Sequence, residues 1–204
     1  WLNNLCDFHN LNLSDEDLLS CGFKVEDDLL GKDLAYYKEF LDWGMENEPH
    51  PVCSRAYDWL ISNKPKLQKV SLCWGDSRIG NVLYKNYKCS ALLDWEMASL
   101  GDPLMDLAWG FAVDECNSIG LGVDRLDGSM SQSDGISIWE TATNLSAENI
   151  DYFRVLALFK FSVIMVRVGK RLIYNEIMPL DSDFHINNFT TEFLDSEVNK
   201  VYDS

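Results

Sequence analysis

The chain has 204 residues, of which 47% are hydrophobic and 12% aromatic, which is enough for one substantial core or two small ones and excludes global disorder. Lys and Arg total 17 against 33 Asp and Glu, giving a formal net charge of −16. Nucleic acids and anionic membranes are bound through clustered positive charge, so this balance argues against either as a general partner.

The 6 cysteines are scattered without a C-x-x-C pair or a matching histidine spacing, which predicts reduced thiols in a cytoplasmic protein rather than a zinc or redox site. The longest apolar stretch, residues 155–168, is shorter than the roughly 20 residues of a membrane span, so no membrane helix is expected. The chain opens without an initiator Met or a signal segment, and we expect it to come from the middle of a longer protein.

The N-terminal part of the chain is predicted to be helical. Residues 1–8 have helical spacing and resemble the end of an amphipathic helix. Residues 10–31 predict a loop or short turns, in which Ser14 followed by acids is a candidate helix cap. An apolar repeat every three to four residues predicts a helix over residues 32–46, and Pro51 begins another that continues to Ser62.

The hydrophobic period then changes. Residues 70–74, 82–84 and 90–95 are short apolar runs separated by loop residues, and they are the predicted strands. Pro103 begins a helix whose pattern ends near Asn117.

The C-terminal part is again predicted to be helical. Residues 120–135 are rich in Gly, Ser and Asp and predict a mobile surface loop. Helices are expected over residues 136–144, 147–174 and 188–202. The fold class is therefore mainly α with a small β insert (α+β).

One segment of the β insert has a spacing that suggests chemistry. Asp76 is followed five positions later by Asn81, and Asp94 comes thirteen positions after that. Phosphoryl transfer needs a carboxylate that orients and deprotonates a hydroxyl, together with hard oxygen ligands for Mg²⁺. Asp76 is the candidate base, although alone it could be a turn aspartate that bonds its own backbone. Asn81 and Asp94 are the candidate metal ligands.

The sequences WGDSRIGN, LLDWE and GDPLMDLAW, within residues 71–109, resemble a known family. They are similar to the motifs H-G-D-x-x-x-x-N, L-D-W and G-D-P-x-x-D-L-A of the aminoglycoside phosphotransferase and choline kinase type of kinase-like fold. The resemblance is strongest to the branch found near or fused to acyl-CoA dehydrogenases. It implies a protein-kinase-like C-terminal lobe.

The resemblance also implies roles for individual residues. Asp76 would be the catalytic base, Asn81 and Asp94 the magnesium ligands, and Arg78 would lie near the phosphate transferred from ATP. For Arg78 the alternative is a surface ion pair.

Other positions of the motif concern ATP. Leu83 and Leu93 would form the floor under the adenine, unless they are ordinary core residues. Trp74 stands where the family usually has His, so we expect aromatic packing to brace the loop. Nothing before Asp76 resembles a glycine-rich phosphate loop or a strand with the ATP-pairing lysine. Residues 1–204 are therefore expected to form the catalytic and acceptor-binding lobe, without the N-terminal ATP-binding lobe of the same protein.

The remaining acids and histidines are expected to be structural. Asp102 should cap the helix that Pro103 begins, and Asp106 should brace the loop of Asp76. The histidines have no partners at ligand or triad spacing and are expected to be incidental; they are His9, His50 and His185.

Three basic residues, Lys160, Arg167 and Arg171, fall on one side of the long predicted helix. They form either a solvated face, which is favoured, or the docking site for an anionic part of the acceptor.

These observations predict an ATP- and Mg²⁺-dependent phosphotransferase acting on the hydroxyl of a small molecule, possible acceptors being a hydroxyacyl compound, an aminoglycoside or a choline-like alcohol. Residues 32–62 and 120–174 should line the acceptor pocket. One alternative is a catalytically silent kinase-like module that only binds ligand. Another is metal-dependent hydrolysis of a phosphoester. By itself, this chain is expected to bind ATP poorly and to transfer nothing.

Overall fold

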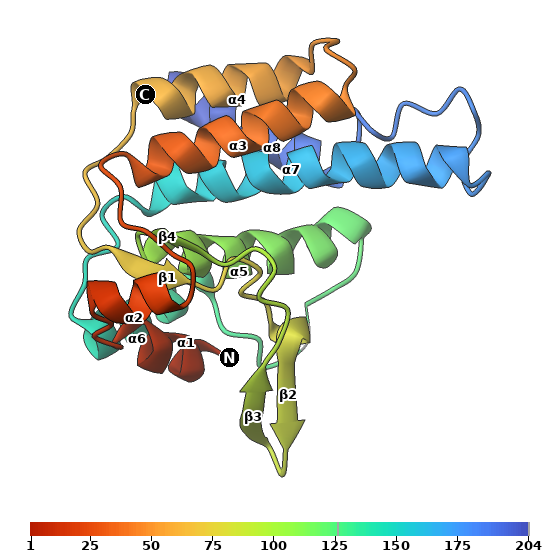
Figure 1. Ribbon diagram of the computed structural model, residues 1–204. Coiled ribbons are helices and arrows are strands. Elements are labelled where there is room, and N and C mark those ends of the chain that lie inside the picture. Colours follow the sequence, from red (N-terminus) through yellow and green to blue (C-terminus); the bar gives the residue numbers. More distant parts are fainter. Residues whose placement is uncertain (126, 204) are drawn as a thin grey trace.

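The computed structural model describes residues 1–125 and 127–203 and is arranged around one buried helix. This helix, α5 (Leu104–Asn117), is buried at every position from 104 to 113, so it has no solvent face along most of its length. On one side it is covered by a layer of four helices (Figure 1): α3 (Leu29–Gly44), α4 (Pro51–Ser62), α7 (Ile150–Tyr174) and α8 (Phe189–Tyr202).

Shorter elements lie on the other side of α5. They are α1 (Leu2–His9), α2 (Asp15–Ser20) and α6 (Gln132–Thr143), and α1 packs against α6. A single turn of 3₁₀ helix, η2 (Ile119–Leu121), follows α5. The site described below lies where these two sides meet.

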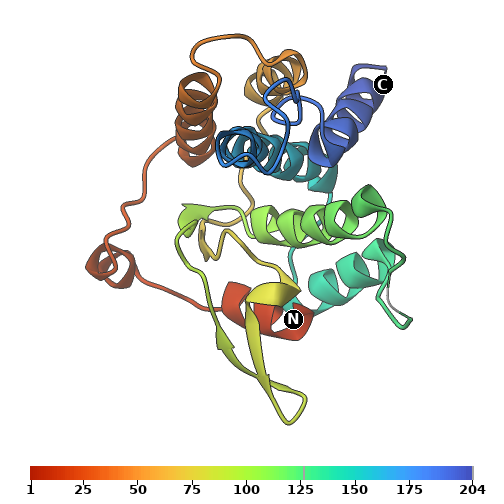
Figure 2. The same cartoon turned by 90° about the vertical axis from the view of Figure 1, so that its right-hand side faces the viewer.

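The strands form two separate antiparallel pairs in the described residues. β1 (Ser71–Cys73) pairs with β4 (Ser99–Gly101), and β2 (Val82–Lys85) pairs with β3 (Lys88–Leu92). The β2–β3 hairpin projects away from the helical body in both views (Figures 1 and 2). A single turn of 3₁₀ helix, η1 (Ile79–Asn81), lies between β1 and β2 in the chain and directly precedes the hairpin.

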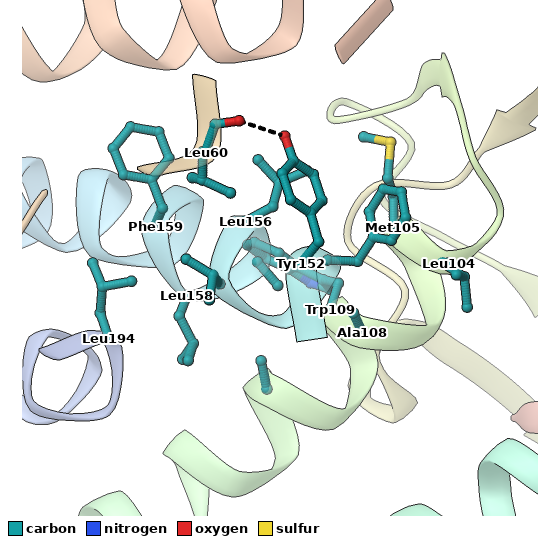
Figure 3. Close-up of a cluster of buried hydrophobic side chains, with 14 of the residues drawn as sticks. Leu60, Leu104, Met105, Ala108, Trp109, Tyr152, Leu156, Leu158, Phe159 and Leu194 are labelled. Carbon is teal, nitrogen blue, oxygen red and sulfur yellow. Dashed lines mark hydrogen bonds between the residues drawn. The ribbon is translucent and has the colours of Figure 1, made fainter. Parts of the chain in front are cut away.

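The main core lies between α5, α7 and the outer helices (Figure 3). Leu60, Leu104, Leu158 and Leu194 are each at most 1% exposed. The buried phenol of Tyr152 donates a hydrogen bond to the backbone carbonyl of Leu60 at 3.2 Å, so its one polar group is satisfied. Burial raises the pKa of this phenol above its ordinary value.

Most predicted elements are found, with shifted ends that have local causes. Ser14 does cap a helix, because its Oγ accepts from Asp17 N and the Asp17 carboxylate accepts from Ser14 N. Helix α3 begins at Leu29 rather than 32 because Asp28 accepts a hydrogen bond from Gly31 N. No apolar pattern marked β4, which is only three residues long.

The predicted loop over residues 120–135 is shorter in the structure. The predicted range includes the end of η2 and the first turn of α6, which begins at Gln132 after the cap residue Ser131. Position 126 of this predicted loop lies outside the described residues. None of the helices described has the continuous apolar length that crossing a membrane requires.

Candidate active site

The segment from Trp74 to Asn81, here called the Asp76 loop, connects β1 to β2 and lies against α5. Gly75 has φ +89°, and a side chain there would collide with the backbone carbonyl of Met97. Gly110 of α5 is equally confined, because a Cβ would meet the ring of Trp1 and the carbonyl of Ser77. Glycine at both positions allows the loop to pack directly on the helix.

Asp106 of α5 holds the backbone of this loop. Its carboxylate is fully buried and accepts hydrogen bonds from Trp74 N at 2.7 Å and from Gly75 N at 2.8 Å. The predicted bracing role of Asp106 is thus seen directly. Asp102 also does what was predicted, since its Oδ1 accepts from Leu104 N at the start of α5, and its Oδ2 accepts from Gln68 N.

His9 is a further member of this network, so the expectation that the histidines are incidental was wrong for this residue. It is 1% exposed, and its Nε2 lies 3.1 Å from Asp106 Oδ2. Trp139 Nε1 lies 3.0 Å from His9 Nδ1. Because an indole N–H only donates, Nδ1 must accept, and Nε2 carries the proton that is donated to Asp106. Asp106 and Trp139 are 97 and 130 residues from His9, so no local sequence pattern could have indicated these contacts.

His50 also has a structural role. Its Nδ1 accepts from Cys53 N at the start of α4, and burial lowers the pKa of this imidazole. The Cys73 thiol is buried near Asp106 and Asp102; burial raises its pKa well above the ordinary value and the two carboxylates raise it further, which disfavours the reactive thiolate.

The Asp76 carboxylate is surrounded by three hydrogen-bond donors and is 15% exposed. Oδ1 accepts from Trp109 Nε1 at 2.8 Å, and Oδ2 accepts from Arg78 Nε at 3.0 Å and from Asn81 Nδ2 at 2.7 Å. The structure therefore brings Asn81 to Asp76, as the sequence spacing suggested, and it also brings Arg78, which only the family resemblance had placed at the site. It adds Trp109, the last residue of the segment GDPLMDLAW, for which no role was predicted.

The amide of Asn81 has a defined orientation. Its Nδ2 donates both to the carboxylate and to the backbone carbonyl of Asp76, at 2.7 and 3.0 Å. Both partners are acceptors, so the NH₂ group must face Asp76 and the oxygen must face away. That oxygen accepts no hydrogen bond within residues 1–125 and 127–203 and is left for another ligand.

Asp94 lies outside this contact group. It was expected to end a strand, but β3 ends at Leu92 and Asp94 is an exposed loop residue with φ +61°. Aspartate tolerates this left-handed conformation better than most residues. The loop is tied to the Asp76 loop because Leu93 N donates to Asn81 O at 2.8 Å. Among the residues described, the Asp94 carboxylate forms no hydrogen bond or ion pair.

The donor set suits Mg²⁺ shared with phosphates rather than a metal held by protein alone. One carboxylate and one amide oxygen, both without a partner, are hard ligands of the kind that Mg²⁺ takes together with substrate phosphates. In the described part of the chain, no group of three or more His, Cys, Asp or Glu could hold a metal ion.

Leu83 and Leu93 are not ordinary core residues, since they are 52% and 43% exposed. The alternative that placed them in the core was therefore wrong. Trp74, in contrast, is fully buried and braces the site as expected: its indole packs against Trp95 and its Nε1 donates to Leu93 O at 2.8 Å.

A cleft of about 670 Å³ opens beside Asp76. Its walls come from α3, α5 and α7, and they include Tyr36, Phe40, Phe161, Arg167 and Arg171. Residues 32–62 and 120–174 were predicted to line the acceptor pocket; within these ranges α3 and α7 do line this cleft, but no described residue of 120–149 does. Helix α4 contributes nothing to this cleft, whereas α5 supplies Trp109, Val113 and Asn117.

The three predicted basic residues do not share one environment, so a common solvated face was wrong. Lys160 is 5% exposed and pairs with Asp33 of α3 at 3.2 Å. Burial acts to lower the pKa of Lys160, but the charge of Asp33 outweighs it and the pKa is raised. Arg167 and Arg171 lie in the cleft, and within the described residues neither has a carboxylate partner.

Comparison with known proteins agrees with this geometry. Residues 2–128, more than half of the chain, match the phosphotransferase enzyme family. The chain belongs to this family. The match includes the whole Asp76 loop, Asp94, and the part of α5 that contacts the loop.

Two curated relatives belong to the branch named above. The chain is 32% identical over 107 residues to acyl-CoA dehydrogenase family member 10 of Mus musculus, covering 52% of this chain and 10% of that protein. It is 30% identical over 149 residues to acyl-CoA dehydrogenase family member 11 of Pongo abelii, covering 67% and 19%. The chain thus spans a fifth or less of the length of these two relatives.

The same fold is found in a solved structure. A Ralstonia eutropha protein assigned as an aminoglycoside phosphotransferase superposes with a TM-score of 0.70 at 16% identity, over 99% of this chain and 62% of that one. The predicted mainly helical, kinase-like fold is therefore confirmed.

Proposed function

We propose that this chain is the catalytic and acceptor-binding lobe of a phosphotransferase that moves the γ-phosphate of ATP to the hydroxyl of a small molecule. The observation that carries the proposal is the Asp76 carboxylate. It lies on the wall of a 670 Å³ cleft and is fixed there by Trp109 and Asn81. A fixed carboxylate beside a substrate-sized cleft can aim and deprotonate a hydroxyl.

In the proposed reaction, Asp76 takes the proton of the acceptor hydroxyl as the hydroxyl oxygen bonds to the γ-phosphorus. The bond between that phosphorus and the bridging oxygen breaks, and ADP leaves with the electron pair. Arg78 uses only its Nε on Asp76, so its terminal nitrogens remain for the oxygens of the transferred phosphate. Mg²⁺, when bound, would be held by Asn81 and Asp94 and would neutralise phosphate charge.

The surface of the hairpin supports an ATP site completed by a second lobe. Leu83 and Leu93 are about half exposed, and Tyr84 and Tyr87 of the same hairpin are exposed as well. Several large apolar side chains exposed in one short segment are consistent with a binding surface. We propose that the adenine of ATP and an N-terminal lobe of the same protein cover them, and that transfer requires this lobe.

The cleft favours an acceptor that is both apolar and anionic. Tyr36, Phe40 and Phe161 provide an aromatic wall, and Arg167 lies over the rings of Phe40 and Trp43. Two guanidinium groups without carboxylate partners repel polycationic aminoglycosides and choline. A hydroxyacyl compound, such as a hydroxy acid, has the required hydroxyl, apolar body and negative charge. The similarity to acyl-CoA dehydrogenase family members supports the same class.

The full-length protein that contains this chain provides the test. With ATP and Mg²⁺, ADP formation should depend on a hydroxy acid and should be much weaker with an aminoglycoside or choline. Thermal stabilisation by ligand without ADP release would instead indicate a silent binding module. Phosphate release from a phosphoester without ATP would indicate a hydrolase, and either result would refute the proposal.

Replacing Arg171 with Gln should raise the KM for the acid acceptor. A hydrogen bond to a charged group contributes about 1.5–3 kcal/mol, so the expected increase is about 10- to 100-fold, with kcat and the KM for ATP little changed. Arg55→Gln is the matched control, because Arg55 forms an exposed pair with Asp195 outside the cleft. An unchanged acceptor KM in Arg171→Gln would show that the anionic group does not bind there.

A further inference from the structure

Among residues 1–125 and 127–203, Trp109 is the one buried donor whose only hydrogen bond is to the Asp76 side chain. The residue is 4% exposed, lies on the fully buried part of α5, and packs against Phe161 with ring centroids 5.8 Å apart. A buried indole N–H needs an acceptor, and here the acceptor is Asp76 Oδ1 at 2.8 Å. The rigid helix and the ring contact therefore fix the direction of this hydrogen bond.

The arrangement distinguishes the two carboxylate oxygens of Asp76. Each can accept about two hydrogen bonds. Oδ2 already accepts two, from Arg78 Nε and Asn81 Nδ2, whereas Oδ1 accepts one, from Trp109. The position that remains for a substrate hydroxyl is therefore on Oδ1, beside the indole. Trp109 and Asp76 both line the cleft, so a hydroxyl bound there has access to Oδ1.

We propose that Trp109 is a positioning residue that sets the orientation of Asp76 and directs Oδ1 toward the acceptor hydroxyl. Without the indole N–H, the Asp76 carboxylate can rotate about χ2, because hydrogen bonds to Oδ2 alone do not fix where Oδ1 lies. The acceptor hydroxyl would still bind, but Oδ1 of Asp76 would less often be aligned to accept its proton during phosphoryl transfer. This proposal depends on the proposed function, in which Asp76 is the base.

The test is Trp109→Phe in the full-length protein, which removes the N–H and keeps an aromatic ring. We expect kcat to fall about 10- to 100-fold, the effect of one hydrogen bond to a charged group, while the KM values for ATP and acceptor change less than about threefold. Trp59→Phe is the control, since Trp59 packs against Tyr152 in the main core and does not line the cleft.

A second variant separates the hydrogen bond from the packing. Benzothienylalanine at position 109 keeps the shape of the indole and replaces only its N–H with sulfur, so it should reproduce the loss of kcat with unchanged thermal unfolding. Normal kcat in this variant would overturn the role of Trp109, even if Trp109→Phe failed to fold.

A spectroscopic measurement provides a readout independent of turnover. In protein labelled with ¹⁵N at tryptophan, the indole proton of Trp109 should move upfield in Asp76→Asn, because a neutral amide accepts a weaker hydrogen bond than a carboxylate. The Trp59 resonance should not move. An unshifted Trp109 resonance would refute the hydrogen bond. Full activity in Asp76→Asn would instead refute the proposed function, so the two failures are distinguishable.

Discussion

Replacing Asp76 with Asn is expected to lower kcat by about 10²- to 10⁴-fold in the full-length protein, the usual contribution of a general base. The amide has nearly the same shape as the carboxylate but cannot accept the hydroxyl proton. Its single acceptor oxygen can accept either from Trp109 Nε1 or from Arg78 Nε and Asn81 Nδ2, but not from all three. Since the shape is kept, the fold should be retained, and the KM for ATP should change little. Acceptor-dependent ADP formation measures the loss of kcat, and circular dichroism measures whether the fold is retained.

The control for this variant is Asp195→Asn, which removes the same charge from α8, where Asp195 forms an exposed pair with Arg55 of α4. Such surface pairs contribute about 0–1 kcal/mol, so neither activity nor stability should change appreciably. If Asp76→Asn kept kcat within about threefold of the unchanged protein, Asp76 would not be the base.

The second large effect concerns stability. Replacing Lys160 with Met is expected to lower the free energy of unfolding by about 3–5 kcal/mol, because it leaves a buried carboxylate without its partner. The side chains of Lys160 and Asp33 are only 6% and 12% exposed, and Lys160 Nζ also lies 4.6 Å from the centre of the Tyr37 ring. The pair joins α7 to α3, two of the helices that line the cleft.

The double variant Lys160→Met with Asp33→Leu identifies the cause of this loss. It removes both charges, so most of the lost stability should return. Lys200→Met is the surface control, since Lys200 is 65% exposed in its pair with Glu197 and should contribute at most about 1 kcal/mol. Urea denaturation of the three variants provides the comparison. Equal destabilisation by the single and double variants would show that packing, rather than an unpaired charge, is responsible.

Most helices could be predicted because their signals are local, although α2 lies where a loop or short turns were expected and the Asp28 cap of α3 was not recognised. Pro51 and Ser62 bound α4 as predicted, and Asn188 precedes α8 as its cap. The contact between Asp76 and Asn81 could also be predicted, since both belong to one short loop. The sequence failed where a contact joins distant elements: nothing near His9 in the sequence indicates that it meets Asp106.

Burial of charge was the other source of error. Lys160 has the spacing of a residue on the exposed side of an amphipathic helix, but α7 is covered on several sides by α3, α4, α5 and α8. A helix in that position has no broad solvent face, so periodicity alone could not separate Lys160 from Arg167. The partner Asp33, more than one hundred residues away, decides the difference.

Helix α5 provides three contacts to the Asp76 loop within two turns: Asp106 to the loop backbone, Trp109 to the side chain and Gly110 to the carbonyl of Ser77. A small rotation or sliding of this helix would displace all three together, whereas the core around it could repack with little loss of folded protein. A substitution in this chain can therefore be harmful in two separate ways, by misplacing the Asp76 carboxylate or by preventing folding. Around α5, substitutions misplace this carboxylate before they prevent folding.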